Sequence, residues 1–150
     1  MKLKPFDNMN CALAKTLDII GERWTLLILR DAFFGTRRFD EFRHNLGIAR
    51  NILTVRLKRL VSEGIMERRP LDSGRYEYVL TNKGLDLQPV LLSMTHWGDH
   101  YKPSPKGRRM IFIERASGQP IADMSVRSAD GRALAPRDIK GVPGPGLDDT

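Results

Sequence analysis

The feature that most constrains the fold is a pair of amphipathic segments joined at Gly47 and followed by two short strand-like segments. Residues 38–46 and 49–63 repeat apolar side chains at helical spacing, and Gly64 stands where a helix C-terminus is expected. Beyond it the spacing becomes that of strands, over 66–69 and 75–80, around the turn-rich tip LDSG. The pattern predicts two helices joined by a tight turn, then a β-hairpin, in an α+β fold.

Two helices are expected before this pair and one after it. Residues 10–20 repeat leucine and isoleucine at helical spacing, with Asn8 or Asn10 as the cap. Residues 22–34 have an unusually apolar body, which predicts a helix buried on most sides. Thr81 or Asn82 is expected to cap a long helix that ends near residue 101, in which Pro89 is a candidate for a kink.

The chain of 150 residues has room for one domain, predicted over 1–102, and a small appendage over 103–150. Within the appendage, KPSPKG resembles a linker, and two similar segments at 116–121 and 129–134 each place a glycine turn between strand-like pieces. They predict a small β meander. It is expected to be held together by Ile111, Ile113, Ile121, Val126 and Leu134 and by docking on the main domain, and either to extend the dimer surface or to cover a ligand pocket. The last residues, KGVPGPGLDDT, have too little apolar content to fold alone, which favours a mobile C-terminus.

Charge favours a polyanionic partner, because the formal net charge is +7 at a pI of about 9.9. Cys11 is the single cysteine, which excludes an internal disulfide and a multi-cysteine metal site, so no metal and no cofactor are expected. The N-terminal segment lacks the apolar run of a secretory signal, and no run is long enough to span a membrane. The sequence predicts a cytoplasmic protein, and it contains no catalytic set, so an enzyme is not expected.

The helix pair and the hairpin together have the layout of a winged helix-turn-helix, in which one helix enters the major groove of double-stranded DNA. From Arg43 through Ser62 there are five cations and no acid, whereas a solvated helix usually mixes both signs. With the leucines of 49–63 inward, we expect one group of side chains to approach bases, namely Arg50, Asn51 and Thr54. Phosphate contacts are expected from Lys58 and Arg59, and further DNA contacts from Arg37, Arg38, Arg68, Arg69 and Arg75. Arg56 lies near the buried stripe and is expected to extend its charge to solvent or to pair with an acid.

Several short motifs occur in the same order and at the same spacing as in a known family. They are Cys11 before the first helix, Gly-x-Arg-Trp at 21–24, Gly-x-x-Arg-Phe at 35–39, Leu-Thr-x-x-Gly at 80–84 and Trp-Gly at 97–98, together with the isoleucine, leucine and arginine spacing of 48–60. Over residues 9–101 the chain closely resembles the HxlR-type winged-helix transcription regulators of the MarR-like superfamily.

The resemblance implies a homodimer, joined through residues 10–20 and a long helix at 82–101, that binds a pseudo-palindromic operator. It also makes Cys11 a candidate redox sensor, because some relatives sense oxidants or electrophiles at this position; the other interpretation is a small thiol packed in the dimer contact. Longer relatives carry cysteine knuckles in the tail, where this chain has Ser117-Gly118 and Asp130-Gly131, so a zinc site is not expected. A small-molecule effector and a protein-interaction module without DNA binding both stay open.

Overall fold

The structure is a computed structural model that describes residues 4–147. The first residues of the N-terminal segment and the last three of the tail expected to be mobile lie outside this range. The chain divides into two compact units, one reaching Gln88 and including the residues from Pro145, the other spanning Pro89–Gly144. The boundary predicted between 102 and 103 therefore falls inside the second unit, and as a boundary between functional modules it stays a prediction.

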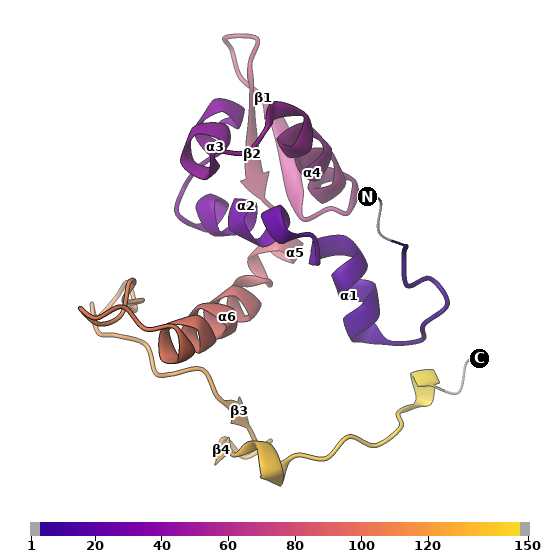
Figure 1. Ribbon diagram of the computed structural model, residues 1–150, viewed down its shortest axis with the longest axis vertical. Coiled ribbons are helices and arrows are strands. Elements are labelled where there is room, and N and C mark those ends of the chain that lie inside the picture. Colours follow the sequence, from indigo (N-terminus) through magenta and orange to yellow (C-terminus); the bar gives the residue numbers. More distant parts are fainter. Residues whose placement is uncertain (1–3, 148–150) are drawn as a thin grey trace. The chain divides into compact units, whose positions relative to one another are not determined.

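The first unit is a winged helix-turn-helix, which confirms the predicted α+β class. The hairpin projects beyond the helix pair, as Figure 1 shows. In chain order the elements are α1 (Ala12–Ile20), α2 (Arg23–Phe33), α3 (Phe39–Leu46), α4 (Arg50–Ser62), β1 (Met66–Pro70), β2 (Tyr76–Leu80) and α5 (Asn82–Leu85).

The core of this unit forms where α2, α3, α4 and the hairpin meet. Phe42 from α3 is completely buried, and so are apolar residues of α2 and α4. The largest side chains without significant exposure are Phe42, Ile28, Leu29, Leu53, Leu57, Leu60 and Met66. Because three α4 leucines at helical spacing are buried, the face of α4 that looks outward is set by the sequence pattern, as predicted.

Two glycines end the helices of the pair. Gly47 has φ 64°, a left-handed conformation that allows the sharp turn between α3 and α4. Gly64 has φ 72° after α4, where Ile65 N donates to Leu60 O at 2.9 Å and Gly64 N donates to Val61 O at 3.0 Å. This bond pattern is a Schellman motif, and it turns the chain directly from α4 into β1.

The hairpin is antiparallel, and its register pairs Met66 with Leu80 at the base and Pro70 with Tyr76 near the tip. Tyr78 N donates to Arg37 O at 2.7 Å, which attaches the segment before α3 to the edge of β2. The hairpin of β1 and β2, which is the wing, is therefore connected to the helix pair by a backbone hydrogen bond. The basic residues of the wing and of the helix pair are thus held in one unit.

Two predictions about helix ends need correction. The long helix expected over 82–101 is broken into α5 and α6 (Gln88–Tyr101), because Pro89 has no N–H to donate to Leu85 and its ring would clash with the Leu85 carbonyl in a continuous helix. Thr81 caps α5 as expected, since its hydroxyl accepts from Gly84 N at 3.2 Å. The cap of α1, however, is Cys11, and Asn10 donates its side-chain amide to Gly146 O at 2.9 Å.

The second unit combines α6 with the polar-rich segment that follows it, residues 102–144, which we call the ribbon. The two predicted turns are present, at Gly118 with φ 70° and Gly131 with φ 90°, but they belong to separate hairpins. One has a single bridge between Ile113 and Pro120, and the other pairs β3 (Val126–Arg127) with β4 (Ala133–Leu134). Short 3-10 turns follow at Pro136–Asp138 and Pro145–Leu147.

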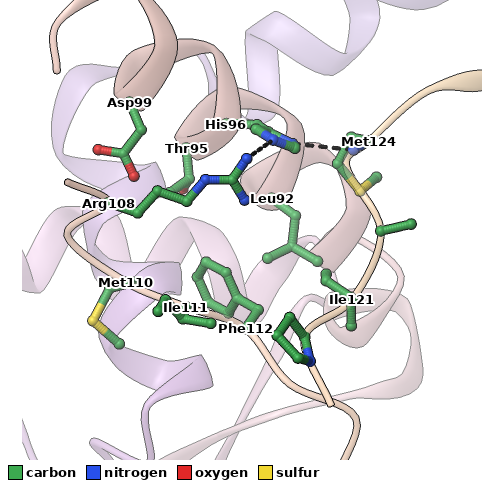
Figure 2. Close-up of a pocket in the computed structure, with 12 residues that line it drawn as sticks. Leu92, Thr95, His96, Asp99, Arg108, Met110, Ile111, Phe112, Ile121 and Met124 are labelled. Carbon is green, nitrogen blue, oxygen red and sulfur yellow. Dashed lines mark hydrogen bonds between the residues drawn. The ribbon is translucent and has the colours of Figure 1, made fainter.

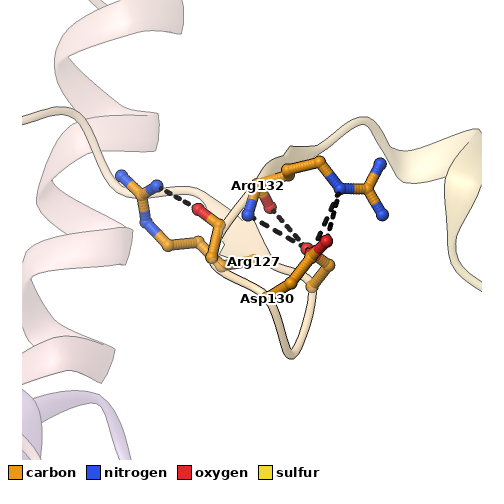
Figure 3. A network of polar contacts seen from close by, with 5 residues as sticks. Arg127, Asp130 and Arg132 are labelled. Carbon is orange, nitrogen blue, oxygen red and sulfur yellow. Dashed lines mark hydrogen bonds and ion pairs between the residues drawn. The ribbon is translucent and has the colours of Figure 1, made fainter.

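Polar contacts hold the β3–β4 turn together. Asp130 accepts from Ser128 and pairs with Arg132 at 3.1 Å, while Arg127 donates to Gly131 O at 2.9 Å (Figure 3). The apolar residues expected to help hold the meander together, however, are mostly exposed, so they form no core within the second unit, and docking on the main domain stays a prediction. Of the five, Leu134 alone is half-buried, and Ile111, Ile113, Ile121 and Val126 are exposed.

Candidate nucleic-acid interface

The outward face of α4 carries the side chains that were predicted to lie there. Asn51 and Lys58 are exposed, as is the apolar Val55 at 56%. Thr54 is half-buried, and its hydroxyl donates to Arg50 O at 2.9 Å, which leaves its oxygen lone pairs and its methyl group to meet a ligand. The face combines an amide, a methyl-bearing surface and a cation, which are the groups that read base edges and phosphates in a major groove.

Several of the predicted DNA-binding cations already have a partner. The Arg50 guanidinium lies 5.2 Å from the Phe39 ring centre and 3.8 Å from the Asp40 carboxylate, so it contacts two residues of α3. Arg59 pairs with Glu63 at 3.1 Å, one turn along α4. These pairs are exposed and therefore weak, and phosphate could replace the carboxylate in each of them.

On the wing, Arg68 stacks over the Tyr76 ring at 3.5 Å and Arg69 pairs with Glu67 at 3.3 Å. Beside the wing, Arg37 pairs with Glu77 at 3.7 Å. Within residues 4–147 three of the predicted cations form neither an ion pair nor a cation–π contact, namely Arg38, Lys58 and Arg75. The structure thus places one of these at the start of α3, one on α4 and one at the wing tip, and their charges are the least neutralised of the set.

The N-terminus of α4 is also open to an anion. Its cap residue is Ala49, which has no side chain to accept from the first turn, and no acid lies in that turn. Uncapped backbone N–H groups at the start of a helix carry partial positive charge and bind phosphate.

Of the two alternatives predicted for Arg56, the structure shows the pairing with an acid. Its Nε lies 3.0 Å from Glu22 Oε2, and the two side chains are 32% and 23% exposed. The N–H does not point along that line, so the contact is an ion pair rather than a hydrogen bond. Glu22 also caps α2, accepting from Trp24 N at 2.9 Å, and therefore joins α2 to α4.

Cys11 is exposed and occupies the cap position of α1, where its side chain accepts no hydrogen bond from the helix. An oxidant could reach the thiol in this chain. Among residues 4–147 no three histidine, cysteine or carboxylate side chains gather as a metal site would require, and no helix is long and apolar enough to cross a membrane.

Three side chains near the interface were not predicted from the sequence. Val55 is exposed on the outward face of α4 and was not among the predicted contacts, although apolar side chains touch thymine methyl groups. Tyr76 supports Arg68 from a diagonal cross-strand position, which hairpin register could have revealed. Glu63, four residues after Arg59, carries the spacing of a helical ion pair and lay just beyond the acid-free segment.

Comparison with known proteins agrees with this architecture. The model of the HxlR-like helix-turn-helix family matches residues 19–106. The HTH-type transcriptional regulator Rv3095 of Mycobacterium tuberculosis is 39% identical over 138 residues, which cover 91% of this chain and 87% of that protein.

Two solved structures are similar as well. The crystal structure of PA1607, described as a transcription factor candidate, is 44% identical at a TM-score of 0.81 and covers 89% of this chain and 95% of its own. The redox regulator HypR in its reduced form is 33% identical at a TM-score of 0.57 over 61% of this chain and 94% of its own. With its winged helix pair, its basic outward face and these relatives, the chain belongs to the HxlR-like helix-turn-helix family of transcriptional regulators, a family of regulators rather than enzymes.

Proposed function

We propose that the protein binds double-stranded DNA in a sequence-specific manner, as a homodimer on a pseudo-palindromic operator in the cytoplasm. The observation that carries the proposal is the outward face of α4, where an uncapped helix N-terminus lies beside Asn51 and the unpaired Lys58, with no acid within the helix. An anion-binding helix end next to base-reading side chains suits insertion into a major groove.

The residues divide into two roles. Asn51, Thr54 and Arg50 approach base edges, and Asn51 has the amide that pairs with adenine. Lys58 and Arg59 neutralise phosphates beside the groove. The segment before α3 and the wing add phosphate contacts through Arg37, Arg38, Arg68, Arg69 and Arg75.

Dimerisation is typical of the family, and the geometry of an operator fixes the distance between the two copies of the helix that enters the groove. Two recognition helices must lie about 34 Å apart to enter successive major grooves on one side of the duplex. We assign the contact between copies to α1 and to the region 82–101. Of the two, α6 exposes the larger apolar face.

Selection of genomic fragments by the purified protein, followed by titration against the recovered duplex, tests the proposal. Lys58→Ala should weaken binding to all sequences and reduce the slope of log affinity against log salt by about 0.9. Asn51→Ala should cost about 1–3 kcal/mol on the operator and little on bulk duplex. Lys140→Ala, which removes a charge from the second unit, is the matched control and should change neither quantity.

The competing function is a protein-interaction module that kept the fold without binding DNA. Absence of binding to both the selected fragments and bulk duplex at low salt would establish that alternative. A salt slope that Lys58→Ala leaves unchanged would show that DNA binds elsewhere on the chain.

We further propose that Cys11 makes the protein responsive to thiol oxidants, a role supported by its exposure and by the similarity to the redox regulator HypR. Operator affinity measured before and after oxidation should differ, and Cys11→Ser should remove the difference. Unchanged affinity after complete thiol oxidation would rule out this role. Any effector of the protein would then be a ligand that does not act through thiol oxidation.

A further inference from the structure

Two apolar features of the structure differ in what they can accept. In the second unit, Leu92 and Ile121 help to line a cavity of about 40 Å³ between α6 and the ribbon, as Figure 2 shows. The cavity has room for a few waters and is too small for an effector. Its polar edge is already occupied from within, since Met124 N donates to His96 Nδ1 at 3.0 Å. The other feature is open to solvent, and it is the side chain of Val55 on the outward face of α4.

Val55 points directly away from the core. Leu53, Leu57 and Leu60 define the buried side of α4, and at about 100° per residue Val55 lies almost opposite their mean direction. The residue is 56% exposed. Valine is a poorer helix former than alanine, and an exposed valine gains little from burial. The stability of the fold therefore gives no reason for valine rather than alanine at this position.

A single exposed apolar residue carries no functional meaning by itself, so its neighbours decide how it is interpreted. Asn51 and Lys58 stand four residues before and three residues after Val55, on the same side of α4, and both are exposed. Asn51 has the amide that pairs with adenine, and Lys58 has a charge for phosphate. Val55 therefore lies between a side chain suited to a base and a side chain suited to the DNA backbone.

The residue before Val55 adds to the apolar surface. Thr54 donates its hydroxyl proton to Arg50 O at 2.9 Å, so it has no proton left to donate to a base. What it offers a ligand is a methyl group and the lone pairs of its oxygen. This part of the outward face therefore suits an apolar group better than a hydrogen-bond acceptor.

In the major groove, the apolar group that a base presents is the C5-methyl group of thymine. Because a helix rises about 1.5 Å per residue, Val55 lies about 6 Å beyond Asn51 along the axis of α4. Successive base pairs of B-DNA are about 3.4 Å apart. A side chain at Val55 therefore meets bases within about two base pairs of the base that Asn51 meets.

We infer that Val55 is a specificity-determining residue, which reads the C5-methyl group of a thymine close to the adenine paired by Asn51. The inference rests on the proposed binding of DNA and adds to it a base contact that involves neither charge nor a hydrogen bond. Burial of one methyl group strengthens binding about 4-fold. A homodimer on a pseudo-palindromic operator makes the contact twice, which raises the effect to about 15-fold.

Replacement of thymine by uracil in the operator tests the inference, because it removes the methyl group and keeps the base pair. Each thymine of the selected operator is replaced in turn, in both half-sites together, and affinity is measured at several salt concentrations. At one thymine position the wild-type protein should bind about 15-fold more weakly. The slope of log affinity against log salt should not change, since no phosphate contact is lost.

Val55→Ala should bind the unmodified operator about as weakly as the wild type binds the uracil operator, and should no longer discriminate between the two. The variant removes exposed methyl groups and favours the helix, so it leaves the fold intact. Val142→Ala makes the same change at a valine that is 73% exposed in the second unit, and it should keep the wild-type discrimination. Because a change of DNA shape caused by uracil would affect both variants alike, the comparison isolates the contact with Val55.

A Val55→Ala chain that still discriminates thymine from uracil as the wild type does would assign the methyl contact to another residue and overturn the inference. An operator in which no replacement weakens wild-type binding by more than about twofold would overturn it too. In both cases operator binding by the wild type would leave the proposed function standing. A wild-type chain that binds neither the selected fragments nor bulk duplex would overturn the proposed function together with the inference.

Discussion

The ion pair between Glu22 and Arg56 allows the link between core packing and DNA binding to be tested. It joins the start of α2 to α4 at 3.0 Å, so it holds these two helices together. Glu22→Gln keeps an oxygen that can accept from Trp24 N and cap α2, but removes the charge. Arg56→Gln removes the cation. The two changes therefore isolate the pair from the cap.

The expected coupling is about 1 kcal/mol. Exposed ion pairs contribute about 0.2–1 kcal/mol, and the 32% and 23% exposure of these side chains places this pair near the upper end of that range. A double-mutant cycle of urea unfolding, at one protein concentration throughout, measures the coupling. The pair Arg59–Glu63, formed within α4 alone, is the control and should couple by about 0.3–0.5 kcal/mol.

Operator binding provides the second measurement. Arg56→Gln should lower affinity a few-fold by loosening α4. The slope of log affinity against log salt should stay that of the wild type, since Arg56 is not among the proposed phosphate contacts. Coupling below about 0.3 kcal/mol would refute the positioning role. A salt slope reduced by about 0.9 would show instead that Arg56 contacts DNA directly.

Three further outcomes follow from the packing and the charges. Gly84→Ala should lower the free energy of unfolding by more than about 2 kcal/mol, because the added Cβ would lie 2.2 Å from Ile65 O. Thermal unfolding measures the change, and an unchanged midpoint would contradict the close approach. Phe42→Ala, at a fully buried position, should cost about 3–5 kcal/mol in urea unfolding. The Arg108 guanidinium, hydrogen-bonded to Asp123, holds the pKa of that carboxyl below its ordinary value of 3.8, so the contact stabilises the ribbon above that pH and is lost as pH falls through the lowered pKa. Carbon NMR should show Arg108→Gln raising this pKa towards 3.8, and an unmoved titration would assign the shift to another neighbour.

Local patterns in the sequence predicted most of the first unit. Helical periodicity identified the α4 stripe, and glycine chemistry identified the turns at Gly47 and Gly64. The pairing of Arg56 with an acid followed from its place beside the buried stripe. These features depend on residues a few positions apart, which is the range over which backbone geometry alone dictates neighbours.

Contacts between distant elements could not be predicted from local sequence patterns. Helical geometry placed Arg50 and Lys58 on or beside the outward face, yet Arg50 is drawn to Asp40 and Phe39 while Lys58 stays unpaired within residues 4–147. Which cation is neutralised depends on the side chains that tertiary packing brings alongside it.

The sequence by itself determined the winged helix pair, its basic face and the family, because periodicity, glycine turns and motif spacing are local. The tertiary structure decided that Glu22 joins two helices, that Pro89 divides the long helix, and that α6 and its ribbon bury nothing within the chain. An apolar residue enters a core only when another surface reaches it, and the sequence does not state whether that surface belongs to the same chain or to a second copy.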